Sequence, residues 1–505
     1  MILAPSLSKE ARVVMLFESD RLRLESIDQI ATIWLDSPVL DSALLAGLSQ
    51  ALGAVQKSSC IDVLVIRGGN PGVFLNGPNL CECVQLGGEV ALRDFSLHGQ
   101  YLLERLERIS QTVPTVAYID GRCTNAGLEL ALACNYRLAV ACPETLLGCD
   151  PLTRGWLLCW GATQRLPRLL GLRTATRLLS KGQLLPARAA RNLGLVDLAF
   201  GPRPAKAELN WFLADLQDHP RRPRRFRGNA GWLSRLWEQT AVGRSSLFDS
   251  VRAELFHDPL ALGMLDALER GAKFGPAEGY QAERRALVHM MLAGQHRKRL
   301  EAALAWESQS SHWHDSPIPE RIAIVGLSEL GIELAVTALR FGTEVVVWDS
   351  NELRRQASLA KLERLVEESV AAGWWTIAER AQKRKHLSIS RNGEGVAEAK
   401  LLFLAGSKEE LHMFLGEMEG FFRPECVIVT TVPTARATVK YSQRCVNCHF
   451  DNASGGHTVE LIEPQGVSED ALCQLGRWLD HCGYRVRGLP AVLQTREEKV
   501  VAIAA

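Results

Sequence analysis

The segment Pro114–Ala139, PTVAYIDGRCTNAGLELALACNYRLA, constrains the fold more than any other part of the chain. A β-favouring run at Thr115–Ile119 is followed by Asp120-Gly121, and small residues then lead into an apolar run that contains one acid, Glu129. This order predicts a buried strand, a tight loop and a helix whose first N–H groups point at the loop. Such a loop is suited to an anion, although a single acid at a helix start is by itself more often a surface residue.

Three further segments carry related patterns. Residues 61–80 read IDVLVIRGGNPGVFLNGPNL, residues 161–171 read GATQRLPRLLG and residues 187–196 read ARAARNLGLV. In this order and spacing the four segments resemble the enoyl-CoA hydratase/isomerase, or crotonase, superfamily. The resemblance implies a ββα spiral domain over residues 12–200, with CoA thioesters as substrates.

The resemblance also implies a set of site residues. Chemistry on a CoA thioester in this superfamily depends on two backbone N–H groups that hold the thioester oxygen, and hydration uses two glutamates. The N–H of Ala126 would be one donor, and Glu129 would be the first acid. The other donor would come from the residue after Gly77, which is Pro78 and has no N–H. The second acid aligns with Pro151, so Asp150, one residue earlier, is the expected substitute.

A second signature begins at residue 321. The apolar strand Arg321–Val325 leads into the turn GLSELG, a helix and a second strand that ends in Asp349. This spacing is expected of a βαβ unit that binds a dinucleotide, with Gly326 and Gly331 in the turn and Asp349 about 20 residues further on for the ribose hydroxyls. The middle glycine is replaced by Ser328, so we expect the pyrophosphate to be held less closely and NAD binding to be weakened.

Later motifs of this half resemble the NAD-binding domain of 3-hydroxyacyl-CoA dehydrogenase. They are HFDNA at residues 449–453 and VELI at residues 459–462. The resemblance implies that His449 is the general base for the 3-hydroxyl proton and that Glu460 orients its imidazole. The family's Asn-Thr-Ser segment aligns with residues 431–433, TVP, which removes a hydroxyl. The chain ends at Ala505, about where the family's NAD domain ends, so we expect no counterpart of its helical C-terminal domain.

Between the two signatures the pattern is helical, at Val251–Leu268 and at Gly279–Trp306, and the stretch SQSSHWHDSPIPE has the composition of a linker. We therefore expect an α/β protein with a crotonase-like domain at 12–200, a helical connector at 201–307, a linker at 308–320 and a Rossmann-like, doubly wound NAD-binding domain at 321–505. This order is similar to a C-terminally shortened multifunctional α subunit of the fatty-acid β-oxidation complex.

Composition narrows the choice of partners and compartment. A length of 505 residues favours two or three domains, and a net charge of +1 gives no reason to expect nucleic acid as a partner. The basic run Arg221–Arg227 is expected to be a solvated linker, with a clamp for the CoA 3′-phosphate as the alternative.

The N-terminus lacks a signal-peptide pattern, and no apolar run is long enough to span a membrane. The thirteen cysteines are expected to be reduced thiols of a cytoplasmic protein. The CVNCH match at residues 445–449 is interpreted as chance, and no metal site is expected.

Two functional hypotheses follow. In the first, the chain is a β-oxidation enzyme with lyase and oxidoreductase domains that acts on 2-enoyl-CoA and 3-hydroxyacyl-CoA, with activity impaired by Pro78, Pro151, Ser328 and Pro433. In the second, it is a non-catalytic paralogue that binds acyl-CoA or assembles with another subunit. A homo-oligomer and a thiolase-type partner subunit both remain open.

Overall fold

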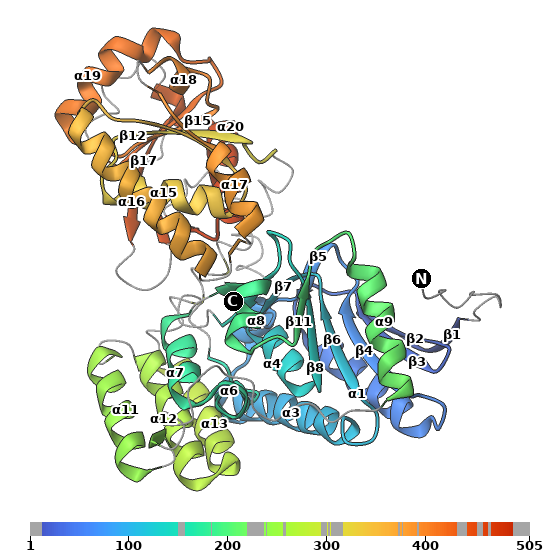
Figure 1. Ribbon diagram of the computed structural model, residues 1–505. Coiled ribbons are helices and arrows are strands. Elements are labelled where there is room, and N and C mark those ends of the chain that lie inside the picture. Colours follow the sequence, from blue (N-terminus) through green and yellow to red (C-terminus); the bar gives the residue numbers. More distant parts are fainter. Residues whose placement is uncertain are drawn as a thin grey trace. The chain divides into compact units, whose positions relative to one another are not determined.

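A computed structural model of the chain divides into two compact units, residues 1–298 and 299–505 (Figure 1). It describes residues 13–149, 157–182, 184–219, 237–238, 240–255, 259–293, 300, 304, 317–371, 374–375, 377–390, 393–431, 442–451, 458–462 and 466–487.

A large sheet forms the body of the first unit, as far as the chain is described. Its spatial order is β1-β2-β3-β4-β6-β8-β11. The strands are β1 (Val14–Glu18), β2 (Leu22–Ile27), β3 (Ile30–Leu35), β4 (Val63–Gly68), β6 (Thr115–Ile119), β8 (Tyr136–Val140) and β11 (Leu198–Phe200). From β3 onward neighbouring strands are parallel. Parallel strands are covered on both faces, which explains the continuous apolar run of β4.

A smaller sheet lies beside the first, in the order β10-β9-β7-β5. Its strands are β5 (Gly72–Leu75), β7 (Gly121–Thr124), β9 (Leu146–Gly148) and β10 (Leu184–Pro186). The chain passes three times from the large sheet to the small one and then into a helix: β4 and β5 precede α2 (Leu80–Gln85) and α3 (Gly88–Ile109), β6 and β7 precede α4 (Ala126–Ala133), and β8 and β9 precede α6 (Ala162–Leu170). This repetition is the ββα spiral that the sequence predicted, and the predicted strand Thr115–Ile119 is β6.

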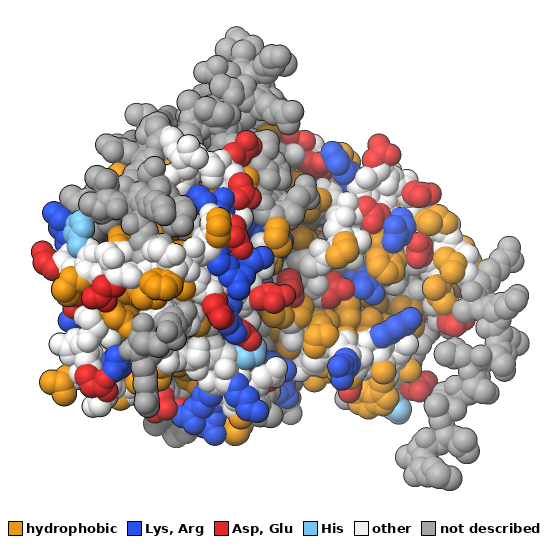
Figure 2. Space-filling model, turned by 90° about the horizontal axis from the view of Figure 1, so that it is seen from above, with side chains coloured by type: hydrophobic (Ala, Val, Ile, Leu, Met, Phe, Trp, Pro, Cys, Tyr) orange, Lys and Arg blue, Asp and Glu red, His pale blue; other side chains and the backbone are white. Residues whose placement is uncertain are grey.

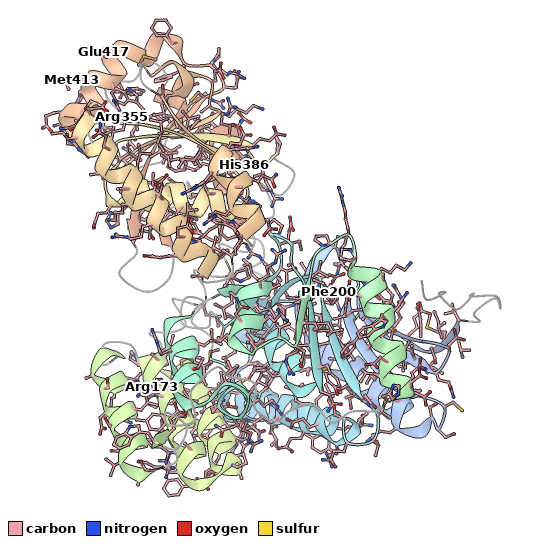
Figure 3. The ribbon with its side chains drawn as sticks, viewed as in Figure 1. Arg173, Phe200, Arg355, His386, Met413 and Glu417 are labelled. Carbon is pink, nitrogen blue, oxygen red and sulfur yellow. The ribbon has the colours of Figure 1, made fainter. Side chains whose placement is uncertain are left out.

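One face of the large sheet is covered by α9 (Ala205–Asp218), which crosses it in Figure 1. Its apolar side buries Leu209 and Leu213 in one cluster with Tyr118 of β6. Phe200, labelled in Figure 3, stacks on Tyr118 with ring centroids 6.4 Å apart. Other helices of this part are α1 (Ser42–Lys57), α7 (Leu172–Lys181) and α8 (Ala187–Leu193).

The helices that follow belong to the first unit. They are α11 (Ala241–Leu255), α12 (Pro259–Phe274) and α13 (Pro276–Leu292). The helical pattern at Val251–Leu268 falls on two helices, because Pro259 suits the first position of a helix and not its interior. Helices α12 and α13 pack on each other and on α6. The basic run 221–227 lies outside the described residues.

The second unit is a doubly wound sheet, in the order β14-β13-β12-β15-β16-β17-β18-β19 within its described part. The strands are β12 (Arg321–Val325), β13 (Glu344–Trp348), β14 (Leu387–Ile389), β15 (Leu401–Leu404), β16 (Val427–Thr430), β17 (Cys445–Asp451), β18 (Thr458–Ile462) and β19 (Arg485–Arg487). The helices include α15 (Glu329–Arg340), α16 (Glu352–Ala371), α17 (Ile377–Lys385), α18 (Glu394–Ala397), α19 (Lys408–Met418) and α20 (Glu469–His481). Counted along the chain from β12, the first six strands lie in the order 3-2-1-4-5-6, which is the order of a dinucleotide-binding fold. The predicted fold class is therefore confirmed for both units.

The distribution of charged side chains on the surface agrees with the net charge of +1. Acidic and basic side chains are interspersed on the face that Figure 2 shows. Of the helices that the structure describes, none is long and apolar enough to cross a bilayer.

Cys445 and Cys448 are both buried in β17, and residues three apart in a strand point to opposite faces. This geometry does not suit the CxxCH haem attachment pattern.

Candidate active sites

Helix α4 begins with a free amide. Asn125, the residue before it, has φ 51° and ψ −115°, which few residues other than glycine adopt. The backbone of Asn125 is bonded on both sides, because its N–H donates to the carbonyl of Gly148 (3.1 Å) and its carbonyl accepts from the N–H of Glu129 (3.0 Å). The next N–H, that of Ala126, has no acceptor among the described residues. It is therefore available to an external oxygen, as expected for the donor at this position.

A second loop, after β5, packs against the start of α4. The carbonyl of Asn76 accepts a hydrogen bond from the N–H of Gly127 (3.1 Å). A Cβ added to Gly127 would lie 2.0 Å from the carbonyl oxygen of Leu75, so the two backbones approach as closely as glycine allows. The loop that the superfamily uses for its other donor is thus next to α4.

That loop offers no second donor at the aligned position. The peptide between Gly77 and Pro78 turns its carbonyl toward Leu40, whose N–H it accepts (3.1 Å), and the proline nitrogen carries no hydrogen. The N–H of Asn79 donates to the carbonyl of Leu40 (2.7 Å), and its side chain caps α2. Asn79 therefore does not replace the missing donor.

Glu129 lies one turn after Ala126 on α4, and it is only 2% exposed. Its Oε1 accepts hydrogen bonds from the N–H groups of Trp160 (2.9 Å) and Ala162 (3.1 Å), at the start of α6. Gly161, between them, has φ 105° and provides no side-chain cap, so the carboxyl of Glu129 satisfies amides that the helix itself leaves unpaired.

A second buried acid, Glu283 of α13, binds the same helix start. Its Oε1 accepts from the N–H (3.3 Å) and the hydroxyl of Thr163. Burial and the charge of Glu283 raise the pKa of Glu129 to about 8, and burial raises the pKa of Glu283 to about 7. The sequence around Glu283 predicts a helix but does not reveal that this acid is buried next to Glu129. An acid on the inward face of a predicted helix was the only available signal.

Asp150, the expected second acid, lies outside the described residues, as does Pro151. The strand before them, β9, ends near Glu129: Cys149 is fully buried, and the charge of Glu129 contributes to raising the pKa of its thiol well above the usual value, after burial itself.

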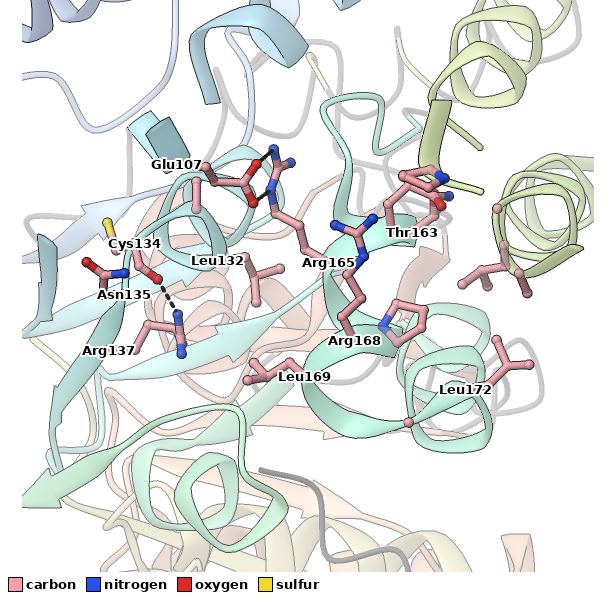
Figure 4. A pocket seen from close by; sticks show the side chains of 18 of the residues that line it. Glu107, Leu132, Cys134, Asn135, Arg137, Thr163, Arg165, Arg168, Leu169 and Leu172 are labelled. Atoms are coloured by element: carbon pink, nitrogen blue, oxygen red, sulfur yellow. Dashed lines mark hydrogen bonds and ion pairs between the residues drawn. The ribbon is translucent and has the colours of Figure 1, made fainter. Parts of the chain in front are cut away.

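The first unit also contains a cavity of about 1020 Å³ (Figure 4). It lies beside the opposite ends of α4 and α6, where Leu132 and Leu169 contribute to its wall. Arg165 is held there by Glu107 through two hydrogen bonds of 3.0 and 3.1 Å, drawn in Figure 4. The lining side chains, in the described part of the chain, do not include those of Ala126 and Glu129.

In the second unit, His449 and Glu460 are brought together by strand pairing. They are direct partners in the antiparallel register of β17 and β18, and both are exposed. Directly paired residues of antiparallel strands have Cβ atoms about 4.5–5.5 Å apart, so the two side chains share one face. Of the TVP segment, only Thr431 lies within the described residues.

The predicted glycine turn joins β12 to α15. Gly326 has φ 90°, and an added Cβ would lie 2.4 Å from the backbone of Gly406. A Cβ on Gly331 would lie 2.3 Å from the carbonyl oxygen of Gly326. These two glycines thus fit the tight turn and the close helix packing of a dinucleotide site. Ser328 caps α15, since its hydroxyl accepts from the N–H of Gly331 (3.2 Å).

Asp349 stands at the end of β13, where the ribose of a dinucleotide would bind, but it is 1% exposed. Its Oδ2 accepts from the N–H of Leu327 (2.9 Å) and its Oδ1 from the N–H of Asn351 (2.9 Å). Arg355, labelled in Figure 3, donates to its carbonyl (3.0 Å). The backbone shape therefore fits a dinucleotide, whereas the side chains of Ser328 and Asp349 are engaged within the turn.

Comparison with known families agrees with both geometries. Residues 25–210 match the enoyl-CoA hydratase/isomerase family, and residues 321–486 match the 3-hydroxyacyl-CoA dehydrogenase NAD-binding domain family. The chain joins a crotonase domain to a dehydrogenase-type NAD-binding domain. The resemblance drawn from the sequence is confirmed, and the family of the second domain implies NAD as its cofactor.

A curated relative matches most of this chain. The fatty acid oxidation complex subunit alpha of Shewanella halifaxensis is 25% identical over 390 residues, which is 74% of this chain and 54% of that protein. The chain therefore spans about half the length of this relative.

Several solved structures resemble parts of this chain. An enoyl-CoA hydratase from Bacillus halodurans is 21% identical, covering 56% of this chain and all of its own, with a TM-score of 0.41. Pseudomonas aeruginosa DspI is 25% identical over 40% of this chain and 82% of its own, with a TM-score of 0.37. Mycobacterium tuberculosis FadB2 is 21% identical, covering 34% of this chain and 64% of its own, with a TM-score of 0.32.

Proposed function

We propose that the crotonase domain binds acyl-CoA thioesters and transfers a proton at the carbons next to the thioester, as in the hydration or isomerisation of 2-enoyl-CoA. One observation carries the proposal: the N–H of Ala126, which has no acceptor among the described residues, and the carboxyl of Glu129 both belong to the first turn of α4. A thioester oxygen bound at the first would place its neighbouring carbons near the second.

In this mechanism Glu129 carries one proton between two carbons of the substrate. Its carboxylate takes a proton from C4 of a 2-enoyl-CoA, and the electrons of the broken C–H bond move through the conjugated system onto the thioester oxygen. The negative charge on that oxygen is stabilised by the Ala126 N–H and by the N-terminal end of α4. The protonated carboxyl then delivers the proton to C2, which completes the isomerisation with one acid; a pKa raised to about 8 makes the Glu129 carboxylate basic enough to take the proton.

The site has one backbone donor where the superfamily has two. Loss of an oxyanion donor reduces rates by about 10²–10³ in other enzymes. Since Pro78 supplies no N–H and Asn79 is engaged elsewhere, we expect slow turnover. Within the described part of the chain Glu129 is the one acid placed beside Ala126, which suffices for isomerisation, whereas hydration requires a second group to activate water.

For the NAD-binding domain we propose a 3-hydroxyacyl-CoA dehydrogenase activity. His449 accepts the hydroxyl proton of the substrate, and Glu460, paired with it across the hairpin, orients the imidazole. The turn from Gly326 to Gly331 would hold NAD, which would supply the acceptor for a hydride from the substrate, and Asp349 stands at the ribose position although its carboxyl oxygens accept from Leu327 and Asn351.

The two activities would make the chain a β-oxidation enzyme of the cytoplasm, with a second copy or a thiolase-type subunit as partner. The similarity to the Shewanella α subunit supports this proposal. The competing candidate is a non-catalytic acyl-CoA-binding or subunit-assembly paralogue, which the absence of a donor at Pro78 favours.

A direct assay separates the two. Purified full-length protein is tested for turnover of crotonyl-CoA and a long-chain 2-enoyl-CoA, and for NAD reduction with a 3-hydroxyacyl-CoA. Thermal shifts with CoA, acyl-CoA and NAD are measured alongside, because a ligand that binds the folded state raises its stability. Turnover abolished by Glu129→Gln supports the enzyme; a thermal shift with acyl-CoA without turnover supports the paralogue.

A further inference from the structure

Two carboxyl groups from distant parts of the chain share the first turn of α6. Glu129 accepts from the amides of Trp160 and Ala162, and Glu283 accepts from the amide and hydroxyl of Thr163. The two acids are 2% and 1% exposed. Four consecutive residues of the chain, 160–163, therefore provide three amides to two buried acids, so neither acid can move without affecting the same short segment.

Glu283 is fixed from its other side as well. Its Oε2 accepts from the side-chain amide of Gln100 on α3 (3.1 Å), and the same amide donates to the carbonyl of Cys159 (2.9 Å). Gln100 thus ties Glu283 to the residue that precedes Trp160. The two oxygens of the Glu283 carboxyl therefore connect to the two ends of segment 159–163: Oε1 to Thr163 directly, and Oε2 to Cys159 through Gln100.

The helix that carries Glu283 is docked on α6 by shape. The side chain of Gln164 lies against Gly271 of α12 and Gly279 of α13, where an added Cβ on either glycine would collide with it. Gln164 also donates to the carbonyl of Ala267 (3.0 Å). This packing fixes the position of α13 on α6, with Glu283 next to Thr163.

We propose that Glu283 is a positioning residue for Glu129: it anchors the first turn of α6, and through that turn and its charge it sets the placement and the protonation of the Glu129 carboxyl. The proposal rests on the proposed function of Glu129. Glu283 has no expected contact with substrate, so it differs from the second acid of the superfamily, whose aligned position here is Pro151.

Charge provides the second connection. Two carboxyls in a buried site do not ionise together readily, so a negative Glu283 favours the protonated form of Glu129. Among the described residues, the other charged or titratable groups that interact with the pair are two arginines, two thiols and one phenol, namely Arg165, Arg284, Cys149, Cys159 and Tyr280. Arg165 is paired with Glu107 and Arg284 donates to the side chain of Gln100, so we expect Glu129 and Glu283 to hold one shared proton near neutrality.

The first test measures the protonation of Glu129 without catalysis. In full-length protein labelled with [δ-¹³C]glutamate, ordinary glutamates have finished titrating above pH 6, so the resonance that titrates near pH 8 and is lost in Glu129→Gln belongs to Glu129. We expect Glu283→Gln to lower its midpoint by about one pH unit. Glu238→Gln is the matched control: Glu238 is a buried acid that accepts the amides of Leu172 and Arg173 at the start of α7, and its variant should leave the midpoint unchanged. An unchanged midpoint in Glu283→Gln overturns the coupling through charge.

The second test measures the anchoring. Hydrogen exchange of the full chain should show that Glu283→Ala lowers the protection of Trp160 and Ala162, which Glu283 does not contact, by tenfold or more, whereas Glu283→Gln, which retains an acceptor for Thr163, preserves it. Glu238→Ala should act only on the amides of α7. If Glu283→Ala exposes Thr163 alone, Glu283 does not act through α6 and the anchoring is refuted.

A final measurement connects these results to function. If the chain turns over 2-enoyl-CoA, the pH profile of kcat should shift in Glu283→Gln by the same amount as the NMR midpoint. If no turnover occurs, the proposed enzyme function fails, while the titration and exchange experiments still decide whether Glu283 positions Glu129. A shifted midpoint with an unshifted rate profile would mean that Glu129 is not the group that limits the rate.

Discussion

The two candidate sites are held in place by different means. In the crotonase domain, Glu129 is buried and depends on α4, α6 and α13, which lie far apart in the sequence. In the NAD-binding domain, His449 and Glu460 are exposed, and the register of one antiparallel pair of strands places them side by side. At a site built by tertiary packing we therefore expect substitutions to change activity, stability and pH dependence together, whereas at a site built by strand register we expect activity to change alone.

The largest effect is expected at the buried acid. Glu129→Gln should reduce enoyl-CoA turnover by about 10²–10⁴, the usual contribution of a positioned acid or base. Steady-state kinetics checks this, with circular dichroism to verify folding and Glu238→Gln as the control. Turnover that survives in Glu129→Gln would remove Glu129 from the site.

The exposed pair should respond in activity alone. His449→Asn is expected to lower NAD-dependent oxidation of a 3-hydroxyacyl-CoA by about 10², again the effect of losing a general base. Its unfolding free energy should change by less than about 0.5 kcal/mol, because the side chain is exposed. A large loss of stability would show that packing matters here as much as at Glu129.

Restoring a backbone N–H at position 78 should raise the rate of enoyl-CoA turnover. Pro78→Ala returns an N–H to the loop opposite Ala126, and we expect kcat for 2-enoyl-CoA to rise by about 10–10². Pro71→Ala, an exposed proline of the same loop region, is the control. If Pro78→Ala folds and its rate is unchanged, the loop does not contribute to the oxyanion site.

The pH dependence of stability should differ between the domains. The folded pKa of Glu129 is raised from 4.5 to about 8, so between these values the folded state binds more protons than the unfolded state. Stability of the crotonase domain should therefore be fully present below about pH 4.5 and be lost as pH rises through 8, by at most about 1.4 kcal/mol per pH unit for one proton. Urea unfolding between pH 5 and 8.5 tests this, and Glu129→Gln should flatten the slope.

The smallest effect concerns the cofactor turn. Ser328→Gly removes the side chain next to the expected pyrophosphate, and replacing a capping serine by glycine costs only a few tenths of a kcal/mol. We expect NAD affinity, measured by calorimetry, to rise about fivefold, which corresponds to about 1 kcal/mol. Ser350→Gly, outside the turn, should leave it unchanged. Equal affinities for Ser328→Gly and the parent chain would mean that the serine is no obstacle.

The sequence patterns predicted the strands and turns whose conformation depends on a few neighbouring residues. The strand Thr115–Ile119 and the turn from Gly326 to Gly331 follow from residue order, because backbone conformation and alternation act over a few positions. The pairing of His449 with Glu460 came from the family resemblance, and the hairpin register places the two opposite each other. Their roles, like that of Glu129, stay predictions.

What the sequence could not predict depends on distant contacts. The burial of Glu129 and the role of Glu283 require α13 to dock on α6, which no spacing reveals. The same applies to Asn79, the residue after Pro78, whose amide donates to the carbonyl of Leu40 and so does not replace the missing donor. Asp349 matched its motif by spacing, but its engagement with Leu327 is a consequence of how the turn folds.

The seating of Gln164 against Gly271 and Gly279 bears on how this chain can be cut and recombined. A fragment that ends near residue 200 would keep every crotonase sequence motif but would leave the side of α6 that receives α12 and α13 open to water. Truncations, domain exchanges and expression limits should therefore be placed after residue 293, since α12 and α13 pack on α6 and belong to the first unit.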